Sequence, residues 1–233
     1  VGSEMCIRDR ISGVWYEIQS DYLEKINADF RDTSASEIQF IPYDASENMK
    51  TEEIKGFGGK LIKLQYEGKY NLKLERSLNF NKECALLMDR RLVSYGGKNS
   101  RIEFCDVLTN NGKRIHVKQY TGSETMSHLF NQGLVSASME KDAADYARLV
   151  DDKIKQIGKH ESISSIEQFQ LALNPIHEVV FAIVRKRDNR DLPFFSKVAL
   201  CSVKKQLKRM GIETKLNWID RINEPKGQTP NEQ

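Results

Sequence analysis

Apolar residues in the middle of the chain change their spacing, and each change predicts a different element. Over 61–78 the leucines are spaced as in a helix. The next three apolar runs, 84–95, 101–109 and 114–120, are strand-like and are separated by turns that contain glycine. We therefore predict a helix followed by a three-stranded meander.

The pattern after Gly122 predicts helices alternating with strands. A long helical region spans 124–157, with Gly133 inside it, and the near-continuous apolar run HEVVFAIV at 177–184 is typical of a buried central strand. A basic helix over 196–210 follows, with Gly211 as its stop, and then a strand over 213–219. The order helix, three strands, helix, strand predicts a mixed α/β core that is extended by a C-terminal helix and strand.

The two ends of the chain are predicted to lie outside this core, which with its basic extension would occupy 61–220. Residues 11–60 predict a strand, a helix that Ser20 caps and a polar loop, and 221–233 is predicted to be disordered. Residues 1–10, VGSEMCIRDR, resemble translated sequencing-adapter sequence. We expect them to be an artefact, and we expect 11–60 to be the remnant of a truncated N-terminal region.

Composition narrows the class of protein. The 233 residues are 39% hydrophobic and 30% charged, as is ordinary for a folded soluble protein. No run approaches the roughly 18 apolar residues that a membrane span requires, and no basic segment precedes an apolar signal core. The four cysteines lack CxxC spacing, so we expect neither a zinc site nor a disulfide framework. These features predict a cytoplasmic protein without membrane contact.

Positive charge is concentrated at the C-terminal end of the chain. From Arg185 onward there are 12 Lys and Arg against 6 Asp and Glu, whereas the first 184 residues carry 24 against 27. A basic surface favours polyanions because it neutralises phosphates and releases counterions. The candidate nucleic-acid-binding residues of this part are Arg185, Lys186, Arg187, Lys204, Lys205 and Lys208.

The hairpin over 101–120 carries the residues best suited to chemistry. His116 and Lys118 are two residues apart, so on a strand they share a face. If the turn has three residues with Gly112 in the left-handed conformation, Asp106 lies opposite His116 and the three side chains converge. If Asn111 and Gly112 instead form a two-residue turn, Asp106 lies opposite Val117 and the site is lost.

With the element order, the segments IEFCDVL and RIHVKQY resemble the PD-(D/E)XK nuclease-like pattern. That pattern has an acid on the second strand, an acid-x-Lys triplet on the third, and a further Glu on the first helix. The resemblance implies that Asp106, His116 and Lys118 are catalytic, with Glu67 or Glu75 from the helix. It implies a restriction-endonuclease-like fold, with Glu67, Asp106 and His116 as metal ligands. His116 is a departure, because most members carry Asp, Glu or Gln there.

Hydrolysis of a phosphodiester explains these residue types. Carboxylate oxygens hold a divalent cation that activates water, and an ammonium group stabilises the charge that develops on the phosphoryl oxygens. We expect Mg²⁺ or Mn²⁺, and an imidazole ligand suits Mn²⁺ better than Mg²⁺. The alternative is that the His-x-Lys pair lies on a solvated edge strand.

Three further side chains could complete such a site. Gln119 follows Lys118, and Gln132 in the segment SHLFNQG could face the hairpin from a helix and contact substrate phosphate. The alternative for SHLFNQG is helix packing, with Gly133 as a bend. Asp89 in LLMDRRLV could join the acidic residues from the first strand, and it ranks below Asp106 as a candidate.

A second resemblance covers most of the chain. The stretches LLMDRRLV, IEFCDVLTNNGKRIHVKQY, SHLFNQGLVSA, FAIVRK and LPFFSKVAL resemble an uncharacterised, sporadically distributed bacterial family. Its patchy occurrence is similar to that of defence or restriction genes, which implies DNA as the substrate, phage defence as the setting, and a homodimer or defence-system proteins as partners. We therefore expect a metal-dependent DNA nuclease. The alternatives are a noncatalytic nucleic-acid-binding module and a protein-interaction subunit of a defence system.

Overall fold

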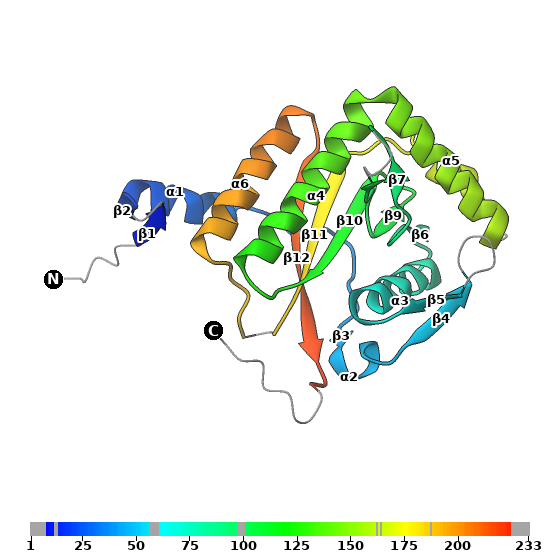
Figure 1. The fold of residues 1–233 in the computed structure, drawn as a ribbon, viewed down its shortest axis with the longest axis horizontal. Helices are drawn as coiled ribbons and strands as arrows, with labels where there is room; N and C mark the ends of the chain where they lie inside the picture. The colour runs from blue at the N-terminus through cyan, green and yellow to red at the C-terminus, as the bar shows by residue number, and fades with distance from the viewer. Residues whose placement is uncertain are drawn as a thin grey trace.

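The main sheet has six strands and helices on both faces (Figure 1). The structure is a computed structural model that describes residues 8–11, 14–55, 61–96, 101–161, 163, 165–186 and 188–224. The sheet order is β3-β12-β11-β10-β9-β6. Strands β3, β12, β11 and β10 are parallel to one another, and β9 is antiparallel to both β10 and β6. The strand bounds are β3 Tyr43–Asp44, β6 Ala85–Leu87, β9 Val107–Thr109, β10 Lys113–Gln119, β11 Glu178–Arg185 and β12 Glu213–Ile222.

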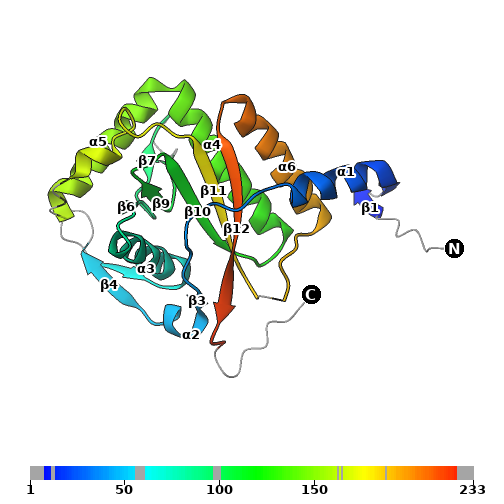
Figure 2. The same ribbon diagram turned by 180° about the vertical axis from the view of Figure 1, so that it is seen from behind.

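Helices cover the sheet unequally, with α3 on one face and α4 and α6 on the other (Figures 1 and 2). A short 3-10 helix, Ile166–Phe169, precedes β11. Three two-stranded ribbons lie outside the main sheet: β1 Arg8–Ile11 with β2 Val14–Glu17, β4 Glu52–Lys55 with β5 Leu61–Leu64, and β7 Val93–Ser94 with β8 Arg101–Ile102. The helix bounds are α1 Ser20–Arg31, α2 Ala45–Asn48, α3 Tyr66–Phe80, α4 Ser123–Asp142, α5 Ala144–Glu161 and α6 Phe194–Arg209.

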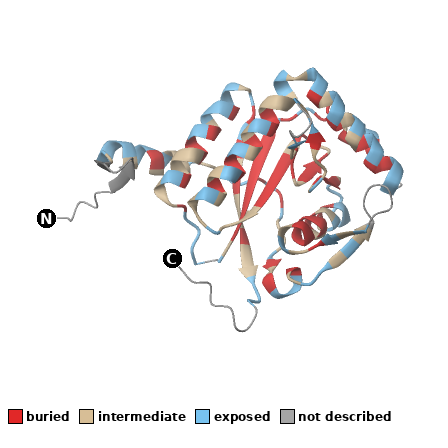
Figure 3. Ribbon diagram, viewed as in Figure 1, coloured by how far each residue is buried: buried red, intermediate tan, exposed pale blue. Residues whose placement is uncertain are grey.

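Strand β11 is buried on both faces, as its apolar run predicts (Figure 3). Val180, Ala182 and Val184 pack in one core cluster with Tyr70 and Leu74 of α3. The alternate residues of β11 pack under α4 and α6 in a second cluster, to which Val179, Phe181 and Ile183 belong. This two-sided core confirms a mixed α/β fold.

The predicted helix over 61–78 begins five residues late. Leu61–Leu64 instead forms β5, which pairs with β4. Ile62 and Leu64 pack with Leu72 of α3 and Leu87 of β6 in a small cluster of their own. The leucine spacing therefore reflects a strand and a helix that share one cluster.

The predicted meander is also interrupted. The predicted strands over 84–95 and 101–109 contribute only their short parts β6 and β9 to the main sheet. The other strands of these segments, β7 and β8, form a separate ribbon. The intervening residues pack under α5, where Met88, Val93 and Phe104 are buried with Tyr146. Burial against a different helix diverts this part of the chain from the sheet.

The predicted helix over 124–157 is two helices, and Gly133 is not where it bends. The break is at Ala143, whose backbone is extended with φ −123° and ψ 92°. Gly133 lies within α4, where an added Cβ would be 2.5 Å from Phe181 Cε1. Close approach of the helix to β11, and not bending, explains the glycine.

The segment predicted to be an N-terminal remnant contributes a strand to the main sheet. Tyr43 and Asp44 of β3 pair with Arg221 and Ile222 of β12. The last strand consequently runs to Ile222, past its predicted end at 219, because β3 pairs with its final residues. Among 221–233, the predicted disordered tail, residues 225–233 lie outside the described residues.

Candidate active site

The turn between β9 and β10 has three residues, which decides between the two predicted registers. Arg114 pairs with Leu108 and Ile115 with Val107, so continuing the pairing puts His116 opposite Asp106. Gly112 has φ +79°, the left-handed conformation that glycine adopts readily. An added Cβ there would lie 2.7 Å from the Pro175 carbonyl oxygen. Of the two registers that the sequence left open, the structure has the one that puts Asp106 and His116 on opposite arms at the same level.

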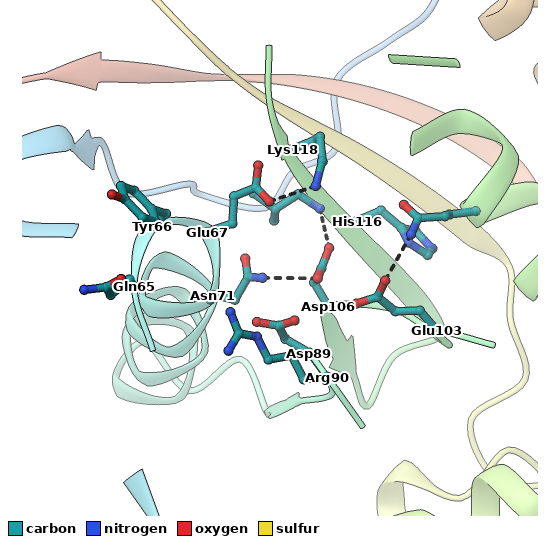
Figure 4. Close-up of a pocket in the computed structure, with 13 residues that line it drawn as sticks. Gln65, Tyr66, Glu67, Asn71, Asp89, Arg90, Glu103, Asp106, His116 and Lys118 are labelled. Atoms are coloured by element: carbon teal, nitrogen blue, oxygen red, sulfur yellow. Dashed lines mark hydrogen bonds and ion pairs between the residues drawn. The ribbon is translucent and has the colours of Figure 1, made fainter. Parts of the chain in front are cut away.

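The far end of β10 has a free edge, because β9 pairs only with its first half. The main-chain N–H groups of Val117 and Gln119 need acceptors there. The Asp106 carboxylate accepts from Val117 N at 2.7 Å, and the Glu67 carboxylate accepts from Gln119 N at 2.8 Å. Two acidic side chains are thereby anchored beside β10 (Figure 4).

Three carboxylates from separate segments gather next to this edge. Asp89 follows β6, Glu103 follows β8 and Asp106 precedes β9, and each offers an oxygen within 4.8 Å of the other two. Side-chain amides hold two of them: Asn71 Nδ2 donates to Asp106 Oδ1 at 3.1 Å, and Gln132 Nε2 donates to Glu103 Oε2 at 3.0 Å. Figure 4 shows the three acids converging on one space. We call them the acidic cluster.

Burial and mutual repulsion disfavour the simultaneous ionisation of the three carboxyl groups in the acidic cluster. Burial raises the pKa of Asp89, Glu103 and Asp106. The charge of Asp89 raises the pKa of the other two further. A divalent cation would reverse both effects, since it favours the ionised form of every carboxylate around it.

Lys118 stands beside the acidic cluster as a cation. Its Nζ is 2.9 Å from Glu67 Oε2. Burial lowers the pKa of Lys118, but the hydrogen bond and the charge of Glu67 outweigh burial, so the pKa is raised overall. The ammonium group is therefore protonated at neutral pH, next to the carboxylates.

These side chains line a pocket of about 330 Å³ at the start of α3. Two buried polar atoms of its lining have no hydrogen-bond partner among the described residues, His116 Nε2 and Asn71 Oδ1. His116 is 3% exposed and Asn71 is 1% exposed. Burial, with a smaller effect of Arg114, lowers the pKa of His116 to about 4, so its imidazole is neutral at pH 7. The pocket thus offers carboxylate oxygens, the ligands that a divalent cation prefers, and two unpaired polar atoms beside them.

The structure brings the three residues predicted to be catalytic, together with Glu67 and Gln132, into this pocket. Glu67, Asp106, His116, Lys118 and Gln132 all line it. Of the three predicted metal ligands, only Asp106 belongs to the acidic cluster, since the ligand atoms of Glu67 and His116 lie outside it, and binding of metal by any of the three stays a prediction.

Two predicted residues lie elsewhere. Glu75, the alternative to Glu67, lines a different pocket, where burial and then the charge of Glu161 raise its pKa to about 7. Gln119 does not line the pocket of the acidic cluster. Its side chain donates to Tyr43 Oη at 2.9 Å and accepts from Arg221 Nη1 at 3.1 Å, which connects β10 to β3 and β12.

Sequence reasoning missed Glu103 and ranked Asp89 too low. Glu103 lies three residues before Asp106, and this E-x-x-D spacing in IEFCDVL was the available signal. Between them the main chain buries Phe104 and Cys105 and turns both carboxylates to the pocket. An irregular stretch, not strand alternation, places the pair.

The basic C-terminal residues lie apart from the pocket lining. Lys204 and Lys205 of α6 pair with Asp32 and Asp29 from the α1 region, at 3.5 and 3.4 Å. Arg185 stacks on the Tyr120 ring at 3.8 Å and donates to the Asp191 carbonyl oxygen. Lys186 and Lys208 are exposed, and Arg187 lies outside the described residues. Their contact with nucleic acid stays a prediction, and the acids near α1 reduce the free positive charge of α6.

Gly68 allows α3 to approach the acidic cluster. A Cβ at this position would lie 3.0 Å from Asp89 Oδ2 and 3.3 Å from Leu64 Cδ2. We expect Gly68→Ala to displace Asp89 and weaken Mn²⁺ binding by about 10- to 100-fold, the usual effect of disturbing the support of a metal ligand. Titration calorimetry measures this. Arg76→Ala on the exposed side of the same helix is the control, and equal affinities in the two variants would contradict the expectation.

None of the helices in the described parts of the chain is long and apolar enough to cross a membrane. A family model described as a family of unknown function (DUF6119) matches residues 10–220. Comparison with curated proteins found no match, and comparison with solved structures found none either.

Proposed function

Since the chain belongs to DUF6119, a family of unknown function, we propose its activity from the site itself: metal-dependent hydrolysis of DNA phosphodiester bonds. The observation that carries the proposal is the acidic cluster, three carboxylates from three segments, in one pocket with the protonated Lys118. Carboxylates that raise one another's pKa without a cation are the usual environment of a divalent-metal site.

The arrangement of elements supports a restriction-endonuclease-like core. Helix α3, strands β6, β9 and β10, helix α4 and strand β11 follow one another in the order α-β-β-β-α-β, if the ribbon of β7 and β8 is treated as an insertion. In the sheet these strands are neighbours in chain order, with β9 antiparallel to the rest. The pocket lies where such a fold would carry its catalytic residues, between the first helix and the hairpin.

Each residue has a part in the proposed reaction. A divalent cation held by Asp89, Glu103 and Asp106 would polarise the phosphoryl group and lower the pKa of an attacking water. Lys118 would stabilise the negative charge that develops on the phosphate oxygens. Glu67 orients Lys118 through their ion pair at 2.9 Å. In the PD-(D/E)XK pattern an acid occupies the position of His116. Glu103 would supply the carboxylate that is missing there.

Cleavage assays with a Lys118 variant test the proposal. We expect the wild type to cleave DNA with Mg²⁺ or Mn²⁺ but not with a chelator. Lys118→Gln should lower the rate by about 10²- to 10³-fold, the effect of losing one group that stabilises transition-state charge. Metal affinity should persist, because the acidic cluster is intact. Lys63→Gln, which removes an exposed lysine paired with Glu53, is the matched control. A wild type without metal-dependent cleavage, or a fully active Lys118→Gln, would refute the proposal.

One observation favours a second candidate, a noncatalytic nucleic-acid-binding module. The residue at the acid position of the triplet is the neutral, buried His116, as in a site that has lost its chemistry. This candidate requires salt-sensitive DNA binding that survives Asp106→Asn and occurs without cleavage. For either activity, the resemblance to sporadically distributed families makes restriction or phage defence the proposed setting.

A further inference from the structure

Two bulky residues that line the pocket have left-handed backbone conformations. Among the described residues, Tyr66, Lys82, Arg90 and Asn223 are the non-glycine positions with positive φ. Tyr66 has φ 52° and Arg90 has φ 59°, and both line the pocket. A left-handed backbone is unfavourable for bulky side chains, and such strain concentrates at functional sites.

The conformation of Arg90 is explained by the acidic cluster. Its main-chain N–H hydrogen-bonds Glu103 and favours the ionised carboxylate. Its guanidinium is exposed, lies beside Asp89 and donates to the Lys63 carbonyl oxygen at 3.2 Å. Arg90 therefore positions Glu103 and brings positive charge to the outer side of the pocket (Figure 4).

Tyr66 has no such explanation within the fold. Its side chain is 49% exposed and makes no hydrogen bond or ring contact within the described parts of the chain. It is the first residue of α3, directly before Glu67, and Figure 4 shows its ring on the far side of Glu67 from the acidic cluster, at the outer edge of the pocket. The backbone thus holds a half-exposed aromatic ring that has no hydrogen-bond or ring partner among the described residues.

We propose that Tyr66 is a stacking platform for an unpaired base of the nucleic acid, so that the substrate is a single strand or an unpaired end. The inference rests on the proposed function, because the acidic cluster has to bind a phosphate of the same strand. Exposed aromatic rings beside a phosphate site bind bases by stacking, with little dependence on sequence.

Duplex DNA has no exposed base face inside the helix on which the Tyr66 ring could stack. Both faces of an internal base pair are covered by its neighbours, so a ring at a pocket edge can stack only on a base that has left the helix. Arg90, exposed on the same pocket, suits the flanking phosphate. The combination of ring and guanidinium therefore selects an exposed base with its phosphate, not the outer surface of a duplex.

Fluorescence anisotropy with Ca²⁺ in place of the catalytic ion separates binding from cleavage. The probes are a labelled oligothymidylate and a labelled blunt duplex of the same length. We expect the wild type to bind the single strand more tightly than the duplex. Tyr66→Leu should weaken single-strand binding by about 5- to 150-fold, the value of one base–aromatic stack. Tyr66→Phe should keep it.

Phe80→Leu is the matched control, since Phe80 is 88% exposed at the other end of α3. It should bind as the wild type does. Tyr66→Gly relieves the left-handed strain, so it should keep or raise the Tm while losing single-strand affinity. Measuring affinity and Tm together separates the two roles of Tyr66. If its role were structural, Tyr66→Gly would lower the Tm.

Three results would overturn the inference: Tyr66→Leu binding the single strand as the wild type does, equal affinity of the wild type for both probes, or binding of neither. The proposed function is judged separately, by metal binding and by cleavage. An enzyme that cleaves duplex DNA with Mn²⁺ and does not depend on Tyr66 would keep the proposed function and refute this inference.

Discussion

Asp106→Asn is expected to lower metal-dependent DNA cleavage by about 10³-fold, which corresponds to about 4 kcal/mol of transition-state stabilisation. Asp106 is the acid of the cluster that is anchored to the sheet, because its partly buried carboxylate lies within reach of Asp89 and Glu103 and accepts from the main chain of β10. The amide keeps the shape of the side chain and removes the charge that a cation needs. Plasmid and oligonucleotide cleavage with Mn²⁺ measures the effect.

The Asp106→Asn variant should fold, so that lost cleavage reports on chemistry. The amide oxygen introduced by the substitution can still accept from Val117 N, as the Asp106 carboxylate does at 2.7 Å. The new amide nitrogen would face Asn71, whose Oδ1 lacks a partner among the described residues and can accept after the Asn71 amide rotates. The rotation moves Asn71 Nδ2 to the side that has no partner among the described residues, so one buried donor is left unsatisfied, at a cost of about 1 to 3 kcal/mol that a folded domain tolerates.

Glu75→Gln is the control for a lost buried charge. Glu75 lies in the other pocket, and burial raises its pKa to about 7, so the substitution neutralises a comparable carboxylate away from the acidic cluster. It should leave cleavage unchanged. If Asp106→Asn keeps cleavage within about tenfold of the wild type, or if Glu75→Gln loses as much, the assignment of the acidic cluster is wrong.

Mn²⁺ should stabilise the protein strongly at pH 8 and weakly at pH 5. Divalent cations bind ionised carboxylates, so protons on the acidic cluster compete with the metal. At pH 8, a concentration 100 times the Kd contributes about 3 kcal/mol, or roughly 5 to 10 °C in Tm for a chain of this size. Thermal denaturation with and without Mn²⁺ measures this difference. Asp106→Asn should lose most of the shift and Glu75→Gln should keep it.

The metal-free protein should lose stability as pH rises above about 6.5. A carboxyl group whose folded pKa is raised stabilises the fold fully below its unfolded pKa, and this contribution disappears as pH rises through the folded pKa. Asp89, Glu103, Asp106 and Glu75 all act in this direction.

His116 acts in the opposite direction but over a lower range. Burial lowers its pKa from 6.5 to about 4, so its contribution is present above pH 6.5 and is lost as pH falls to 4. The two effects oppose each other below pH 6.5, and only the carboxyl groups act above it. A metal-free Tm that rises between pH 6.5 and 8, or an equal Mn²⁺ shift at pH 5 and pH 8, would contradict this electrostatic description.

Local features of the chain were predictable because they depend on neighbours in sequence. Apolar runs identified β11 and α6 to within a few residues, and Ser20, predicted to cap α1, is its first residue, directly after the N-cap Gln19. Gly112 is compatible with a three-residue and with a two-residue turn, and the structure has the three-residue turn, which puts Asp106 opposite His116. Strand alternation then puts Lys118 on the same side as His116. The two possible pairings of the hairpin arms were therefore predictable from the order of residues, and the folded chain decided between them.

Packing between distant segments decided the rest. Asp89 and Glu103 reach Asp106 because the chain between β6 and β9 leaves the sheet to bury Met88 and Phe104 under α5, and no periodicity describes that path. Glu67, and not Glu75, meets Lys118 because α3 begins at Tyr66 after β5 has joined a ribbon.

Contacts between distant segments also explain why the basic C-terminal residues are not part of the site. Lys204 and Lys205 have acidic partners near α1, more than 170 residues away in sequence, which a count of charges along the chain does not reveal. Spacing and turn chemistry are properties of a few consecutive residues. The composition of a pocket is a property of which surfaces exclude water together, and that is defined only once the whole chain has folded.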